Sequence, residues 1–296
     1  MKIPSSITEY LTECEIRKYT PRTLRSYKNN LSLFCNFCLS IGVEDTTDLT
    51  LGTVKQFTKH MMHNGRKATY INGLLKTIKS YITYIYEEYG EGFNTKKSFK
   101  WLKEEKPVIQ TFSPADIKKL FKNCCGNDFM DIRDTCILTM FFETGIRCLE
   151  LCSIKESDIH SDFIIINGKN HKQRVVPITP PLKKAMHRYE RCKEAYFDLK
   201  QHDNNYFLSF HGRMLNNSAV ENVLKRRGQG IEGIRISPHT CRHTNAQQLL
   251  KQGLDVYTIS RLLGHENIAI TQTYLRSLSN DSILEIARGH SVLQNL

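Results

Sequence analysis

No run of apolar residues in this chain approaches the roughly 18 residues of a membrane-spanning helix. The first residues, MKIPSSITEYLTE, also lack the apolar segment of a secretory signal peptide. We therefore expect no membrane partner and a cytoplasmic location. In that reducing compartment, the 10 cysteines are expected to stay free thiols.

Sequence patterns that bind metals are also missing. Cys35 and Cys38 form one C-x-x-C pair, but no second pair follows at the spacing of a zinc finger. The pair lies in the apolar sequence LSLFCNFCLSIG, which favours buried cysteines that act as small hydrophobic residues. His239, Cys241 and His243 alternate along an expected helix and would point to different faces. We expect neither a metal nor a cofactor.

What the chain does have is positive charge. Its 296 residues suffice for two domains, and 40% hydrophobic with 24% charged residues is typical of a globular protein. The net charge is +12, and both halves of the chain are net positive. Such an excess favours a polyanionic partner, most often nucleic acid. A protein that is merely basic would have the same composition.

Residues 1–105 carry apolar side chains at helical spacing and are expected to form a four-helix unit that binds DNA. Thr20 and Pro21 have the pattern of a helix start, with threonine as the N-cap. Helix N-termini and short hydroxyl side chains bind phosphate, although a solvated basic surface explains each candidate equally well. The candidate DNA contacts are Tyr19, Thr20, Arg22, Thr23, Arg66, Lys67 and Thr69.

Residues 106–113 belong to a polar, proline-containing stretch and are expected to link this unit to a second domain, residues 114–296. A strongly apolar helix in that domain should end in a turn at Gly145, with Arg147 opening the next helix. Glu150 follows one turn later, so Arg147 could serve only as a salt-bridge partner. YFLSF at 206–210 is expected to form a short strand.

Residues 162–178 give the one clear strand pattern. Two β-branched runs flank GKNHKQ, which predicts a β-hairpin whose turn carries Lys169, His171 and Lys172. A cationic hairpin tip can reach into a DNA groove. A turn lysine is more often simply solvated.

Residues 237–276 gather imidazoles, a guanidinium and a phenol. His239 and Arg242, at i and i+3 of a helix that starts at 237, would share one face suited to a phosphate. His265 follows the expected helix end at Gly264, and Tyr274 lies on another short helix. A phenol can act as a nucleophile in such a setting. Taken singly, each residue has a commoner structural role, and only the joint spacing indicates chemistry.

These segments together resemble the motifs of the tyrosine recombinase, or phage integrase, family. TGIRCLEL matches the first-arginine box, GKNHKQRVVPI the lysine hairpin, HTCRH the His-x-x-Arg box, and LLGHENIAITQTYL the histidine and nucleophile boxes. The implied catalytic set is Arg147, Lys169, His239, Arg242, His265 and Tyr274. Asn170 stands where a glycine often follows the hairpin lysine, which leaves open whether Lys169 or Lys172 reaches the DNA. The layout is similar to that of compact Xer-like and mobile-element recombinases.

The resemblance implies a mainly helical α+β fold: a helical core-binding domain and a catalytic domain that form a C-shaped clamp on double-stranded DNA. Tyr274 would form a 3′-phosphotyrosine, while Arg147 and Arg242 brace the phosphate oxygens. Lys169 would protonate the leaving 5′ oxygen. The two histidines of the set, His239 and His265, would assist the tyrosine proton and bind the phosphate, respectively. Glu150 is our candidate for orienting Arg147.

In this family, a helix after the nucleophile passes to a neighbouring subunit of a cyclic tetramer. Residues 279–296 hold a short apolar stripe that would suit this role, or would pack on their own domain. Two other functions remain open. One is a type IB topoisomerase, which shares the chemistry without synapsis. The other is a DNA-binding protein with a silent catalytic site, which the complete catalytic set argues against.

Overall fold

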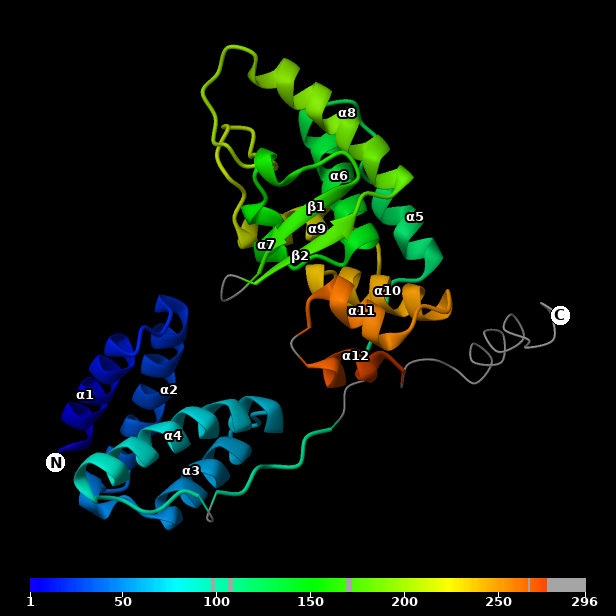
Figure 1. The fold of residues 1–296 in the computed structure, drawn as a ribbon. Coiled ribbons are helices and arrows are strands. Elements are labelled where there is room, and N and C mark those ends of the chain that lie inside the picture. Colours follow the sequence, from blue (N-terminus) through cyan, green and yellow to red (C-terminus); the bar gives the residue numbers. More distant parts are fainter. Residues whose placement is uncertain (97–98, 106–108, 169–171, 266, 276–296) are drawn as a thin grey trace, which may run out of the picture. The chain divides into compact units, whose positions relative to one another are not determined.

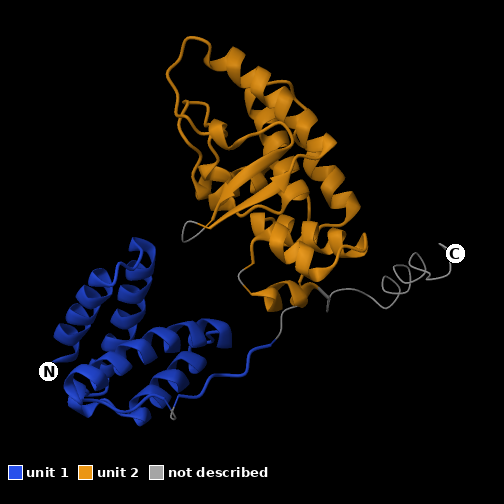
Figure 2. Ribbon diagram, viewed as in Figure 1, with its two compact units in different colours: residues 1–107 blue, residues 108–296 orange. Residues whose placement is uncertain are grey.

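The computed structural model describes residues 1–96, 99–105, 109–168, 172–265 and 267–275. The chain divides into two compact units, residues 1–107 and residues 108–296 (Figure 2). Helices predominate in both units (Figure 1). None of the helices in the described ranges combines the length and the apolar character that a membrane span requires.

The described residues of the first unit form four α-helices, as the sequence predicts. Thr20 accepts a hydrogen bond from the backbone N–H of Thr23 and so caps the second helix, with Pro21 at its first position. Buried aromatic residues hold the helices together; for example, the rings of Phe34 and Phe57 meet edge to face at 5.3 Å. The elements are α1 (Ile3–Ile16), α2 (Pro21–Ser40), the 3₁₀ helix η1 (Thr46–Asp48), α3 (Leu51–His63) and α4 (Ala68–Tyr89).

The second unit surrounds a two-stranded antiparallel sheet with helices. Two long helices, α6 and α8, pack against each other, and α10, α11 and α12 group at one end of the unit (Figure 1). Its elements are α5 (Pro114–Lys122), α6 (Phe129–Thr144), α7 (Cys148–Ser153), the 3₁₀ helix η2 (Glu156–Asp158), β1 (Phe163–Asn167), β2 (Gln173–Pro177), α8 (Pro180–Phe197), α9 (Asn217–Arg227), α10 (Pro238–Lys251), α11 (Val256–Leu263) and α12 (Ile268–Leu275).

The predicted β-hairpin is confirmed. β1 pairs with β2 in a register that sets Ile164 opposite Val176, and both side chains are buried. Beyond the Asn167–Gln173 pair, the N–H of Gly168 donates to the carbonyl of Lys172 at 2.8 Å. The loop residues 169–171, which include Lys169, lie outside the described residues.

The strand expected at 206–210 is wrong. Leu208 forms only an isolated bridge with Met214 on the other side of a turn. The backbone of this segment bonds to other groups instead. The N–H of Leu208 donates to the Tyr189 hydroxyl at 3.1 Å, and its carbonyl accepts from Arg133 at 3.1 Å. These side chains satisfy the polar groups that a neighbouring strand would otherwise pair.

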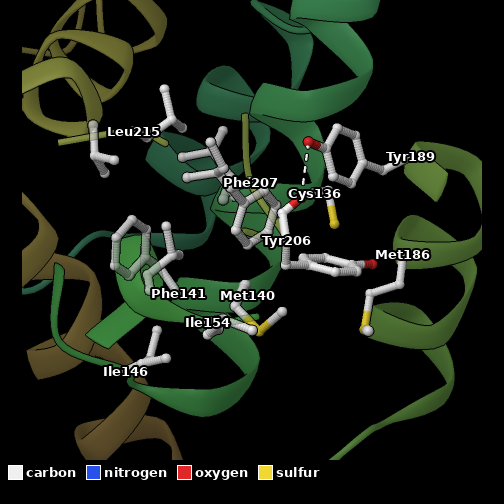
Figure 3. Close-up of a cluster of buried hydrophobic side chains, with 14 of the residues drawn as sticks. Cys136, Met140, Phe141, Ile146, Ile154, Met186, Tyr189, Tyr206, Phe207 and Leu215 are labelled. Atoms are coloured by element: carbon white, nitrogen blue, oxygen red, sulfur yellow. Dashed lines mark hydrogen bonds between the residues drawn. The ribbon is translucent and has the colours of Figure 1, made fainter. Parts of the chain in front are cut away.

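The core of the second unit supports the turn that follows α6. Phe141 near the end of α6 belongs to the same hydrophobic cluster as Phe207 and Tyr206 (Figure 3), and all three are buried. The Tyr189 hydroxyl donates to the carbonyl of Tyr206 at 3.1 Å and ties α8 to the same cluster. The C-terminal end of α6 is therefore held firmly where the chain turns at Gly145.

Candidate active site

The turn after α6 sets the position of Arg147. Gly145 ends the helix with a left-handed backbone, φ 59°, and Ile146 is buried. Arg147 is the N-cap of α7, and its backbone N–H donates to Glu150 Oε2 at 3.0 Å. Its side chain also reaches Glu150, with Nη1 2.7 Å from Oε1, while Nη2 donates to the carbonyl of Gly264 at 2.8 Å. The salt bridge that the spacing suggested is present.

Arg242 projects from the first turns of α10, which Ser237 caps. It is buried and bridges two loops: Nη1 donates to the carbonyl of Gly145 at 2.7 Å and Nη2 to the carbonyl of Leu263 at 2.8 Å. His239, one turn earlier, is exposed. Of the imidazole and the guanidinium expected to share one face of α10, His239 thus lies at the surface and Arg242 is buried.

Arg174 on β2 belongs to the same cluster, although the sequence patterns did not single it out. Its Nη1 and Nη2 donate to the two oxygens of Glu150 at 3.0 and 2.8 Å, and its Nε donates to the carbonyl of Leu262 at 2.8 Å. The carbonyls of residues 262–264 therefore each accept from a different arginine. One signal existed in the sequence: Arg174 shares a strand face with the buried Val176.

Tyr274 is buried between α10 and α11. Its hydroxyl and Nδ1 of His243 share a hydrogen bond of 2.9 Å, and its ring stacks on that of His265 at 6.4 Å between centroids. Nδ1 of His265 is bonded to the Thr271 hydroxyl at 2.7 Å. His243, whose spacing in the sequence indicates at most a weak metal ligand, is thus the imidazole bonded to the tyrosine.

The cations dominate the electrostatics of this cluster. Burial, and then the charges of Arg147 and Arg174, lower the pKa of Arg242 to about 9, so its guanidinium stays charged at neutral pH. Burial raises the pKa of Tyr274, and the nearby Arg242 and Arg147 oppose that rise. Glu150 is buried, yet its bonds to the two arginines hold its pKa below the ordinary value. The net charge of the buried groups is positive, which suits an anion.

The histidines of the cluster are neutral at physiological pH. Burial, and then the charges of Arg242 and Arg147, lower the pKa of His265 to about 4. Partial desolvation lowers the pKa of His239 and His243 as well. A neutral imidazole has one nitrogen that accepts a proton and one that donates a hydrogen bond. The site therefore offers proton acceptors beside fixed positive charges.

The other residues that the sequence predicts for the site or for DNA binding belong to the hairpin and to the first unit. Lys172 is exposed just before β2, and Lys169 lies outside the described residues. Thr20, Arg22 and Thr23 lie at the N-terminus of α2, and Arg66, Lys67 and Thr69 lie at that of α4. All six are exposed except Thr23, which is partly buried. In the described part of the chain, no three His, Cys, Asp or Glu side chains are grouped so that they could hold a metal ion.

Known proteins match both units. Residues 110–281 match the phage integrase family, and residues 7–89 match the phage integrase N-terminal SAM-like domain. Tyrosine recombinase XerC of Thermodesulfovibrio yellowstonii is 28% identical over 275 residues, which cover 90% of each chain. Tyrosine recombinase XerD of Halalkalibacterium halodurans is 25% identical over 262 residues, 87% of this chain and 88% of the relative.

Solved structures share the fold. The Tn1549 transposon integrase in complex with transposon right end DNA aligns with a TM-score of 0.78 at 17% identity, over 97% of this chain and 99% of that one. A lambda integrase dimer bound to a COC′ core site gives 0.75 at 17% identity, over 95% and 97%. With the family match spanning more than half of its length, the chain belongs to the phage integrase family of tyrosine recombinases.

Proposed function

We propose that this site-specific recombinase cuts and rejoins double-stranded DNA with Tyr274 as its nucleophile. The observation that carries the proposal is the convergence of Tyr274, Arg147 and Arg242 around the end of α11. A buried phenol beside fixed cations is matched to a phosphodiester, whose charge rises in the transition state. The scheme needs no ATP, because the protein–DNA bond conserves the energy of the broken bond. The two arginines take the electrostatic role that a metal ion has in other phosphoryl transfers.

In the proposed cleavage step, the Tyr274 oxygen bonds to the scissile phosphorus as the bond from phosphorus to the 5′ oxygen breaks. Arg147 and Arg242 hold the non-bridging oxygens. Lys169 gives a proton to the leaving oxygen, which departs as a 5′-hydroxyl. Rejoining reverses these transfers with a 5′-hydroxyl from the partner duplex. Exchange of one strand from each duplex leaves a Holliday junction, and a second round of exchange resolves it.

The three histidines take separate parts in the proposal. His239 assists removal of the Tyr274 proton, as the family resemblance implies, and His243 is supported as a second acceptor by its 2.9 Å bond to the hydroxyl. His265 bonds the phosphate through Nε2. That geometry is favoured when the Thr271 hydroxyl donates to Nδ1, because Nε2 then carries the proton.

The first unit is proposed to bind the DNA backbone so that the two units clamp one duplex. Its candidate contacts lie at the N-termini of α2 and α4, where free backbone N–H groups favour phosphate. The candidates are Thr20, Arg22, Thr23, Arg66, Lys67 and Thr69. Four such subunits would hold two duplexes in a synaptic tetramer.

The test first selects bound sequences from a pool of random duplexes with the Tyr274→Phe variant, which we expect to bind without cleaving. The parent chain is then incubated with the selected site carrying a nick beside the scissile phosphate, so that the freed fragment diffuses away. A denaturing gel should show a covalent protein–DNA adduct for the parent and none for Tyr274→Phe. An adduct in the variant would exclude Tyr274, and no adduct with the parent on a bound site would leave a DNA-binding protein. Relaxation of supercoiled plasmid without recombinant products would instead favour a topoisomerase.

A further inference from the structure

Arg174 shares Glu150 with Arg147 but is the more deeply buried of the two arginines. Three of its N–H groups are used inside the protein: two bond the oxygens of Glu150 and one bonds the carbonyl of Leu262. Its side chain is 11% exposed, whereas that of Arg147 is 39% exposed. Of the two guanidiniums that share Glu150, Arg147 is therefore the one with room to meet a ligand.

Glu150 connects the two arginines. Its Oε1 accepts from Arg174 at 3.0 Å and from Arg147 at 2.7 Å, and its Oε2 accepts from Arg174 at 2.8 Å and from the backbone of Arg147 at 3.0 Å. Among the described residues, the partners that this carboxylate would keep without Arg174 all belong to Arg147, at its own helix terminus. A two-oxygen bond from a planar guanidinium fixes both the position and the tilt of the carboxylate.

Arg174 also packs against the turn that leads to His265. A Cβ added to Gly264 would lie 2.9 Å from Cδ of Arg174 and 3.2 Å from its Nε. Together with the bond to Leu262, this contact fixes the end of α11 relative to β2. The carbonyl of Gly264 is the second acceptor of Arg147. Both groups that hold the Arg147 guanidinium are therefore themselves held by Arg174.

We propose that Arg174 is a positioning residue for DNA cleavage, which acts by fixing Glu150 and the Leu262–Gly264 turn so that Arg147 meets the scissile phosphate in the reactive orientation. This inference rests on the proposed function of the site. A direct phosphate contact by Arg174 is the competing role, and a purely structural contribution to folding is the third. The first two roles differ in whether the effect of Arg174 on cleavage depends on Arg147. The third predicts a loss of folded protein without slower cleavage per folded molecule.

The experiment measures single-turnover adduct formation on the nicked duplex for Arg174→Met, Arg174→Lys and a control, Arg133→Met. Arg133 matches Arg174 in chemistry, because it also bonds one carboxylate, Asp134, and one carbonyl, that of Leu208, in the core around α6. Rates are compared at a temperature where each variant is folded, together with the affinity for the unnicked site. Misplacing a catalytic group by about 1 Å can cost roughly 100-fold in rate.

We expect Arg174→Met to slow cleavage about 10- to 100-fold with a DNA affinity within about threefold of the parent. Arg174→Lys should be nearly as slow, because lysine restores the charge but not the two-oxygen bond. Arg133→Met should cleave at the parent rate per folded molecule. In an Arg147→Lys background, adding Arg174→Met should slow cleavage by less than about threefold, since its effect passes through Arg147.

Equal slowing by Arg174→Met in the parent and Arg147→Lys backgrounds would overturn the proposal in favour of an independent phosphate contact. Equal rates for Arg174→Met and Arg133→Met would overturn it in favour of a structural role. If Arg174→Met fails to fold, Arg174→Lys carries the same comparison, and parent-like cleavage by it would contradict the geometric argument. An adduct that survives Tyr274→Phe would instead refute the proposed function.

Discussion

His243 and Tyr274 share a hydrogen bond of 2.9 Å between the imidazole Nδ1 and the phenolic oxygen. The bond ties α12 to α10, the helix that also carries Arg242. The proposed nucleophile is therefore held by the same helix as one of the two cations proposed to bind the phosphate.

We predict that His243→Phe removes this hydrogen bond and leaves the core volume largely intact. The unfolding free energy should fall by about 1 kcal/mol, and adduct formation should slow about tenfold. A double-mutant cycle with Tyr274→Phe, followed by urea unfolding, measures the coupling directly. Strictly additive stability losses would mean that the bond contributes nothing in solution.

Gly145→Ala should disturb the arginine cluster as well as the turn. The position has φ +59°, and an added Cβ would lie 2.5 Å from Leu263 Cδ2 and 2.6 Å from Asn245 Oδ1. We expect a loss of about 3 kcal/mol or more and strongly reduced cleavage, because strain and overpacking add. Gly42→Ala is the matched control: its φ is +78° with no atom within 4 Å of the added Cβ, so it should cost only about 1–2 kcal/mol. If thermal unfolding shows that the two variants lose the same free energy of unfolding, the packing argument is contradicted.

Acid should destabilise the second unit through His265. Its folded-state pKa of about 4 lies below the ordinary value of 6.5, so below pH 6.5 the unfolded chain binds a proton that the folded chain does not. Stability from this group is complete above pH 6.5 and is lost as the pH falls towards 4, with a slope below about 1.4 kcal/mol per pH unit. His265→Gln should unfold with a shallower pH dependence in that window. Parallel curves for parent and variant would exclude His265 as the source.

The roles of the two hairpin lysines, Lys169 and Lys172, can be distinguished by changing the leaving atom of the DNA substrate. A sulfur in place of the 5′ bridging oxygen leaves without a proton, so it bypasses a missing acid. We expect Lys169→Met to slow cleavage of the oxygen substrate about 10²- to 10⁴-fold and to cleave the sulfur substrate at nearly the parent rate. Lys172→Met should show no such selective rescue. The reverse pattern would assign the proton to Lys172.

Deleting residues 281–296 tests the tetramer. If this segment passes between subunits, the truncated chain should bind a single site with nearly parent affinity but lose most of its recombination. Band shifts on one site and recombination between two sites measure the two activities. Equal loss of both would argue for packing on its own domain.

Much of this architecture is readable from local sequence. The Thr20 and Ser237 caps, the left-handed glycines at 145 and 264, and the hairpin are all short-range patterns with a backbone cause. The strand expected at 206–210 fails because distant side chains, Tyr189 and Arg133, take its backbone groups. Local pattern carries no information about such partners.

Local sequence pattern also fails to identify distant partners in the candidate site. The motif residues are recognisable by spacing, but Arg174 and His243 join the cluster through contacts across 24 and 31 residues of sequence. An inward-facing arginine on a strand hints at a buried partner without naming it. Glu150, predicted as a neighbour of Arg147, proves to be shared with a second cation, and only the fold brings that cation close.

The three arginine bonds to the end of α11 also have a consequence for folding. They join residues separated in sequence by 88, 21 and 117 positions, and the remaining bond of Arg242 closes a loop of 97. Most of these contacts form only after long loops have closed, which is entropically costly and slow. The cluster of Arg147, Arg174 and Arg242 should therefore be among the last features to form during refolding, and anion binding would report on molecules that have completed the fold.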